Sequence, residues 1–106
     1  MSDKISVSSL PDFDAATFLR NEEDMAAYLN AALEEGDTDS LIEALGTVAR
    51  ARGMTEIARE SGLAREALYR ALRPGATPRF DTIAKVCKAF GLRLSVVQDK
   101  PREAVQ

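Results

Sequence analysis

Residues 54–72 read MTEIARESGLAREALYRAL and carry the pattern of two short helices that meet at a tight turn. Ala58 supplies a small side chain where two crossing helices must approach each other closely. Gly62 can adopt the left-handed backbone conformation that ends the first helix, and Leu63 follows as an aliphatic residue that fills the corner. The stretch therefore predicts a helix-turn-helix whose second helix covers residues 64–72.

This second helix has two chemically different faces. The 3.6-residue period places Leu68, Ala71 and Leu72 on one side, which we expect to be buried. The other side is polar, cationic and aromatic and consists of Glu66, Tyr69, Arg70 and Arg73. In the DNA major groove arginine pairs with guanine edges and glutamate accepts from cytosine, so this helix is a candidate for reading duplex DNA. The competing interpretation is an ordinary helical hairpin whose arginines are solvated.

Composition predicts one domain, residues 1–106, without catalytic chemistry. The chain has 106 residues, of which 45% are apolar, enough for a single modest core. It has one cysteine, Cys87, and no histidine, which excludes disulfides within the chain, Cys/His zinc sites and imidazole-dependent catalysis. Cys87 follows Ile83 by one helical turn in an apolar stripe, so we expect it in the core. No cofactor motif or catalytic constellation is recognisable, so we expect no cofactor, no metal and no enzyme activity.

The beginning of the chain does not read as a targeting segment. Residues 1–12, MSDKISVSSLPD, lack a cationic start followed by an apolar run. No apolar stretch approaches the roughly 20 residues that span a bilayer. The sequence therefore predicts a cytoplasmic protein.

The formal net charge of −3 hides a division along the chain. Residues 1–47 carry eleven acidic and two basic side chains, whereas residues 48–100 carry eleven basic and five acidic ones. The basic part coincides with the predicted helix-turn-helix, as attraction to a polyanion requires, because phosphate contacts supply much of the affinity for DNA. The acidic part either serves solubility or faces a different partner.

A helix is expected directly after Asn21, which can cap it, and before Gly36, which can end it. Its first turn holds Glu22, Glu23 and Asp24, where the positive end of the helix dipole favours anions. Its apolar face consists of Met25, Tyr28, Leu29, Ala32 and Leu33. A shorter helix is expected before it, over residues 14–20.

A further helix is expected to end at Gly53, immediately before the helix-turn-helix. Ser40 and Glu43 have the spacing of a capping box at its start. Its apolar face consists of Leu41, Leu45, Val48 and Ala49. Gly46 inside this helix costs roughly 1 kcal/mol relative to alanine, so it either marks a close helix contact or is neutral drift.

The loop RPGATPRF, residues 73–80, follows the helix-turn-helix, because its prolines and glycine forbid regular structure. Arg73 and Arg79 flank this loop and either contact the DNA backbone or are solvated. The last helix is expected over residues 80–90. Its inward side chains are predicted to be Phe80, Ile83, Cys87 and Phe90.

Short strands are expected near both ends of the chain. Ile5 and Val7 alternate with serines over residues 4–8, and Leu92, Leu94 and Val96 alternate with Arg93 and Ser95. A lone strand cannot satisfy its own backbone donors and acceptors. The C-terminal strand must therefore pair either with residues 4–8 of the same chain or with its copy in a dimer.

From Phe13 to Val97 the chain resembles the probable addiction-module antidote proteins, small Xre-type antitoxins of the HigA-like group. The resemblance rests on the pieces FDAATFL, DMAAYLNAALEEGD, ALGTVARARGMTEIARESGL, REALYRAL and FDTIAKVCKAFGLRLSV. It implies a mainly α fold, a five- to six-helix bundle with an Xre- or lambda-repressor-like helix-turn-helix and one or two short terminal strands. It also implies a homodimer that represses its own operon and neutralises a small basic RelE/HigB-like toxin.

The same resemblance assigns the DNA-contacting positions. The family's recognition helix falls on residues 64–72, with Arg65, Glu66, Tyr69 and Arg70 facing the groove. Ala64 replaces the usual Ser or Thr cap, which removes a partner of one backbone donor. Met54 replaces a phosphate-binding Gln, so Thr55 is the hydroxyl left near that phosphate. The full candidate set is Thr55, Ala64, Arg65, Glu66, Tyr69, Arg70, Arg73 and Arg79.

The resemblance also gives the acidic part a partner. A toxin that grips mRNA is expected to be cationic, and an anionic surface would meet it by charge complementarity and accelerate the encounter. The candidate toxin-binding residues are Glu22, Glu23, Asp24, Glu34, Glu35, Asp37 and Asp39. Residues 1–47 are thus expected to face the toxin, and residues 48–98 to face DNA.

Two functional hypotheses follow from these assignments, and an enzyme is the third alternative, which we do not expect. The first is a dimeric autorepressor and antitoxin that reads two operator half-sites about 34 Å apart. The second is a protein-interaction module that only captures the toxin, DNA binding having been lost with the cap and the glutamine. A general Xre-type regulator without a toxin is a variant of the first.

Overall fold

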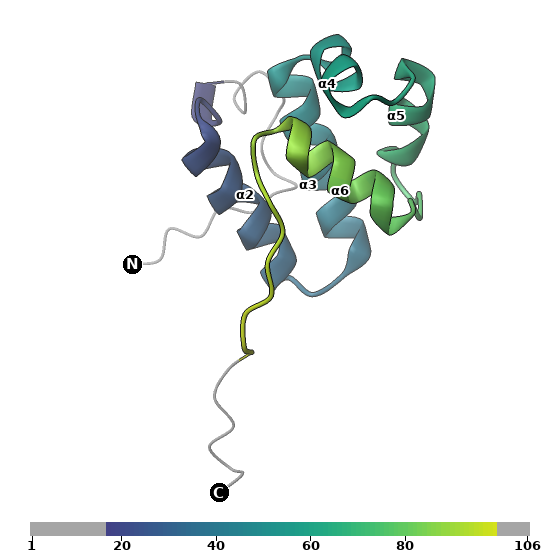
Figure 1. Cartoon of the computed structure of the whole chain (residues 1–106). Helices are drawn as coiled ribbons and strands as arrows, with labels where there is room; N and C mark the ends of the chain where they lie inside the picture. The colour runs from purple at the N-terminus through teal and green to yellow at the C-terminus, as the bar shows by residue number, and fades with distance from the viewer. Residues whose placement is uncertain (1–16, 100–106) are drawn as a thin grey trace, which may run out of the picture.

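The computed structural model describes residues 17–99, in which five helices form the molecule shown in Figure 1. They are α2 (Glu22–Glu34), α3 (Thr38–Arg52), α4 (Met54–Ser61), α5 (Arg65–Ala71) and α6 (Phe80–Ala89). The prediction of a mainly helical fold is confirmed. Of the helix expected over residues 14–20, Thr17 and Phe18 are helical, whereas Leu19 and Arg20 are not, so the prediction extends the helix two residues too far. The part before Thr17 lies outside the described residues, as does the strand expected over residues 4–8.

Helix α2 begins as predicted. The Asn21 side chain accepts a hydrogen bond from the Asp24 amide at 2.8 Å, and three acidic residues fill the first turn. The predicted apolar face is buried at Met25, Tyr28, Leu29 and Ala32. Leu33 is the exception, because it is 50% exposed. Leu33 therefore belongs to the predicted apolar face but is not buried with the rest of it.

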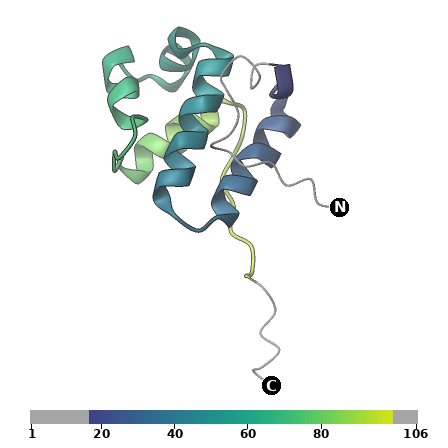
Figure 2. The ribbon, with the colours of Figure 1, turned by 180° about the vertical axis from the view of Figure 1, so that it is seen from behind.

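Helix α3 runs beside α2 in the opposite direction, as Figure 2 shows, and its residues 44–49 are all buried. Thr47 lies within this run and satisfies its hydroxyl by donating to the Glu43 carbonyl oxygen at 3.0 Å. Helix α4 packs against α3, and α6 packs against α4. The core consequently lies around α3, with Ile42, Leu45 and Val48 at most 1% exposed.

The predicted capping box at the start of α3 is wrong. The helix begins at Thr38, two residues earlier than Ser40, and Asp37 occupies the capping position without a side-chain hydrogen bond. Ser40 therefore lies inside the first turn. Its hydroxyl donates instead to the Glu35 carboxylate at 2.9 Å, which links the end of α2 to the start of α3.

Gly46 marks a close contact between α3 and the residue that follows α5. A β-carbon at this position would lie 3.3 Å from the Leu72 carbonyl oxygen and 3.2 Å from the Arg50 guanidinium. A β-carbon here would require the Leu72 backbone or the Arg50 side chain to move by a few tenths of an ångström, so the glycine eases this close approach. Of the two interpretations of Gly46 left open by the sequence, the structure favours the close contact.

The junction of α4 and α5 has the predicted turn geometry. Gly62 has φ +80°, and the amides of Gly62 and Leu63 both donate to the Ala58 carbonyl oxygen, at 3.1 and 3.2 Å. Ala58 is buried at this junction, and Leu68 on α5 is 0% exposed. Helix α5 is one residue shorter at each end than predicted, since Ala64 and Leu72 are its caps.

Helix α6 buries Val86 and Cys87, and Phe90 directly after it is buried as well. The prediction for Cys87 and Phe90 is confirmed, and Ile83 is half-buried. Phe80 is 71% exposed, so its predicted inward position is wrong. Side chains on a helix point toward its N-terminus, so the first residue of α6 projects beyond the part of the helix that packs on the core.

The predicted C-terminal strand is not formed within residues 17–99. The Leu92 amide donates to the Cys87 carbonyl oxygen and closes α6, but residues 93–99 have no regular structure. Leu94 is 46% exposed and Val96 is 97% exposed, so the alternating aliphatic residues are not buried against the helices. A strand needs a neighbouring strand to bond with, and no described segment provides one.

We predict that Gly62→Ala lowers the free energy of unfolding by about 1–2 kcal/mol, because a β-carbon is disfavoured at a positive φ. No atom lies within 4 Å of the added carbon, so the cost comes from backbone strain alone. Urea unfolding followed by circular dichroism measures it. Gly62→Asn should cost clearly less, since asparagine tolerates this conformation, and equal losses for the two variants would contradict the argument.

Candidate functional site

Helix α5 presents an exposed face at one corner of the molecule (Figure 1). Burial of Leu68 and Leu72 against the core fixes the rotation of this short helix. The residues predicted to face DNA are then directed to solvent. Arg65, Glu66, Tyr69 and Arg70 are all exposed, with Tyr69 at 44%. The structure thus leaves the predicted groove-facing set accessible for contact with another molecule.

Two members of this face contact each other. The Arg65 guanidinium donates a hydrogen bond to the Tyr69 hydroxyl at 3.1 Å, and its central carbon lies 5.1 Å from the centroid of the Tyr69 ring. The residues are four positions apart, so they are neighbours on the helix surface. The cation–π contact and the hydrogen bond together restrict the rotamers of both side chains. Arg65 is therefore held close to the helix, with its remaining N–H groups available to a partner.

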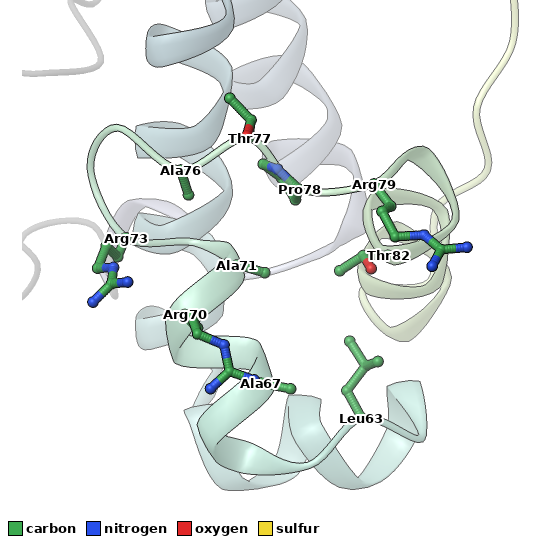
Figure 3. A pocket seen from close by; sticks show the side chains of 10 residues that line it. All are labelled: Leu63, Ala67, Arg70, Ala71, Arg73, Ala76, Thr77, Pro78, Arg79 and Thr82. Carbon is green, nitrogen blue, oxygen red and sulfur yellow. The ribbon is translucent and has the colours of Figure 1, made fainter.

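A shallow hollow of about 450 Å³ lies between α5, the following loop and the start of α6 (Figure 3). Leu63, Ala67 and Thr82 extend toward its interior, whereas the guanidinium groups of Arg73 and Arg79 point away on opposite sides. Arg79 forms an ion pair with Asp81 at 3.3 Å, so part of its charge is already compensated. Neither Ala67 nor Thr82 was singled out by the sequence, because the hollow forms only where α5, the following loop and the start of α6 come together in the fold.

The starts of α4 and α5 show the two differences from the family pattern that the sequence indicated, at Met54 and Ala64. Met54, which stands where the resemblance expects a phosphate-binding Gln, is 8% exposed and belongs to the core. Thr55 next to it is exposed. Ala64, which stands before α5 where a hydroxyl residue was expected, makes no side-chain cap. Thr55 is consequently the hydroxyl that the first turn of α4 directs to solvent.

The carboxylates of α4 interact with their own helix. Arg59 pairs with Glu56 one turn earlier, which lowers the pKa of the Glu56 carboxyl below its usual value. The hydrogen bond between Glu60 and Glu56 raises the pKa of Glu60. All of these groups are at the surface, so the pairs are worth little in stability. Arg59 thus offsets part of the acidic charge of α4 itself.

The predicted toxin-binding residues fall into two groups, at opposite ends of α2. The residues Glu22, Glu23 and Asp24 occupy its first turn, roughly 18 Å along the helix axis from Glu34. The group at the first turn has structural contacts: Asp24 accepts from the Arg20 amide at 3.4 Å, and the Glu22 side chain lies over Gly91.

The second group surrounds the turn between α2 and α3, and we call it the acidic turn. It consists of Glu34, Glu35, Asp37 and Asp39, all of them exposed. Leu33, half exposed, lies directly before them and adds an apolar side chain to the same end of the molecule. Figures 1 and 2 both show this turn at the end of the molecule away from α4 and α5.

No group of three or more Asp, Glu, Cys or His side chains within residues 17–99 is arranged to hold a metal ion. No helix in that range is long and apolar enough to cross a membrane. Cys87 is 4% exposed, and burial raises the pKa of its thiol. A buried thiol with a raised pKa is a poor nucleophile and a poor metal ligand, because both roles need the thiolate.

Comparison with known proteins identifies similar chains. The model of a family described as "Probable addiction module antidote protein" matches residues 9–98. A protein of Haemophilus influenzae, described as uncharacterized, is 45% identical over 91 residues, which cover 86% of this chain and 94% of that protein. No solved structure gives a significant match.

We predict that Cys87 reacts slowly with a disulfide reagent such as Ellman's reagent at pH 8, and at full rate only after unfolding in denaturant. Its raised pKa keeps the thiol protonated at this pH, and its burial blocks the reagent. Thr77→Cys, which adds a thiol at an exposed loop position, is the control and should release one further equivalent at once. Immediate reaction of the unchanged chain would contradict the burial of Cys87.

Proposed function

Because this chain belongs to the family of probable addiction module antidote proteins, we propose that it is an antitoxin with two separate binding surfaces. The acidic turn and Leu33 bind and neutralise a small basic RelE/HigB-like toxin. The exposed face of α5, as the recognition helix of an Xre-type helix-turn-helix, binds operator DNA. Acting as a homodimer, the protein represses its own operon.

The observation that carries this proposal is the separation of charge in space. The cationic side chains of α5 and the acidic turn lie at different ends of one molecule. Each surface is exposed, so neither has to be uncovered by a conformational change before it binds. DNA attracts the first surface through its phosphates, and a basic toxin is attracted to the second. The two partners can therefore be bound at the same time.

Of the seven acidic candidates, the acidic turn is the better toxin site. All four of its carboxylates are exposed, whereas Asp24 of the other group is only partly exposed, and Leu33 offers an apolar side chain beside them. Protein interfaces combine a desolvated apolar centre with a polar rim in this way. Glu22, Glu23 and Asp24 stabilise the start of α2 through its dipole, which gives them a role within the fold.

Within the DNA-facing surface, Arg65, Glu66, Tyr69 and Arg70 are proposed to read base edges. Arg73 and Thr55 are proposed to contact phosphates and so to fix the position of α5 in the groove. Arg79 is a weaker phosphate contact than Arg73, since Asp81 competes for its guanidinium. Ala64 contributes only backbone at the start of the recognition helix.

A second candidate is a module that captures the toxin and does not bind DNA. The observation in its favour is that the starts of α4 and α5 lack the polar side chains expected there. Met54 is buried where a phosphate-binding side chain was expected, and Ala64 provides no cap. Weak or absent DNA binding in the presence of full toxin neutralisation would favour this alternative.

We predict that the Arg65→Ala, Arg70→Ala double variant binds a DNA fragment from upstream of its own gene at least about tenfold more weakly than the unchanged chain. A gel shift at several salt concentrations measures this. Affinity of the unchanged chain should fall as salt rises, because each phosphate contact releases counterions. Arg20→Ala removes a positive charge just before α2 and should bind like the unchanged chain. Absence of any shift at low salt would contradict the repressor proposal.

We predict that reversing Glu34 and Asp37 to lysine slows association with the basic protein encoded beside this gene by about tenfold or more, because like charges then meet. Surface plasmon resonance at two salt concentrations measures the association rate. The matched control reverses Glu22 and Glu23, at the other end of α2, and should change the rate much less. An equal decrease of the association rate in both variants would contradict the assignment of toxin binding to the acidic turn. Gel shifts should be unaffected or strengthened.

A further inference from the structure

Residues 92–99, here called the C-terminal segment, leave apolar side chains and backbone groups uncovered. Leu94 is 46% exposed, Val96 97% and Val97 81%. After the Leu92 amide, no backbone group of the segment is hydrogen-bonded within the described part of the chain. Figures 1 and 2 show the segment leaving the helices beyond α2. Unpaired backbone groups beside alternating aliphatic residues are the surface that another strand covers.

We propose that the C-terminal segments of two copies pair as antiparallel strands about a two-fold axis at Val96, and that this ribbon forms the dimer. This inference rests on the proposed function, which requires a dimer, and specifies how that dimer forms. A two-fold interface brings the same patch together twice, so the segment must be complementary to itself. In an antiparallel pair centred on Val96, the residues facing each other are Val96 and Val96, Ser95 and Val97, Leu94 and Gln98, and Arg93 and Asp99.

Charge selects this register. Arg93 faces Asp99 of the second copy, and Asp99 faces Arg93, so the ribbon is closed at each end by an ion pair. Neither side chain forms an ion pair within residues 17–99. If the axis lay at Ser95, Arg93 would face Val97 and both ion pairs would be lost. Opposite charges that face each other across strands stabilise a pair, and like charges destabilise it.

The same register gives the ribbon an apolar face. Side chains alternate along a strand, so Leu94 and Val96 lie on one face together with Leu94 and Val96 of the second copy. In the isolated chain Val96 is 97% exposed and Leu94 46% exposed, so the pairing would cover apolar surface that the chain leaves in contact with solvent. Helix α5 lies away from the C-terminal segment in Figure 1, so this pairing leaves the cationic face of both copies uncovered.

A charge-swap experiment tests the pairing, with sedimentation equilibrium of the full chain as the measurement. Arg93→Asp and Asp99→Arg each place two pairs of like charges in the ribbon and should weaken dimerisation by about tenfold or more. The double variant Arg93→Asp, Asp99→Arg restores opposite charges and should recover the dimerisation of the unchanged chain to within about threefold. Arg65→Asp, the same charge change on α5, should leave dimerisation unchanged.

Cysteine cross-linking tests the register. Residues that face each other in an antiparallel pair have α-carbons about 4.5–5.5 Å apart, within the range that a disulfide spans. Val96→Cys should therefore form a dimer that survives denaturation without reductant. Ser95→Cys should form little, because its two copies are diagonal neighbours about 7–8 Å apart. The unchanged chain, whose Cys87 is buried, should form none.

A monomeric full chain overturns the proposal, and so does a dimer in which the double charge swap gives no recovery. Equal cross-linking of Val96→Cys and Ser95→Cys overturns the register at Val96. These results differ from failure of the proposed function. If the chain dimerises through the ribbon but gives no gel shift, the ribbon proposal stands and the repressor proposal fails. If a dimer binds DNA but the double charge swap gives no recovery, the repressor proposal stands and the ribbon proposal fails.

Discussion

The left-handed turn at Gly62 is the constraint on which the exposed surface of α5 depends. Two consecutive amides, those of Gly62 and Leu63, share the Ala58 carbonyl oxygen, which fixes the direction in which the chain leaves α4. Leu68 then enters the core and sets the rotation of α5 about its axis. Seven residues are too few for an independently stable helix, so packing on α4 must hold α5 in place. A rigid turn and one fully buried leucine thus decide which side chains a partner meets.

The core around α3 gives this arrangement its support. Helix α3 touches α2 on one side and α4 on the other, and α6 closes against α4. The close passage of the Leu72 backbone over Gly46 ties the end of α5 to the same helix. The proposed toxin surface at the α2–α3 turn and the proposed DNA surface on α5 are therefore two ends of one packed unit. A toxin bound at the acidic turn does not need to compete with DNA for space.

The alternating aliphatic residues of the C-terminal segment are typical of a strand, although the segment forms no strand in the isolated chain. The alternation of Leu94 and Val96 predicts a strand, yet within residues 17–99 the segment has no neighbour to pair with and stays exposed. The proposed ribbon reconciles the two observations, because the missing strand is supplied by a second copy. The proposed dimer then joins two α5 helices through residues outside the helical core, so core packing and dimerisation can be altered separately.

The sequence by itself determined the features that depend on near neighbours in the chain. The cap at Asn21, the glycine turn at Gly62 and the buried faces of α2 and α5 follow from local geometry and helical period. It also determined membership of the antidote family, through residues 9–98. Only the tertiary structure decided that Phe80 and Leu33 are exposed, that α3 begins before Ser40, and that the acidic residues divide between two ends of α2. Helical period shows which side of a helix is apolar. How many turns of that side are buried depends on where the neighbouring helices end.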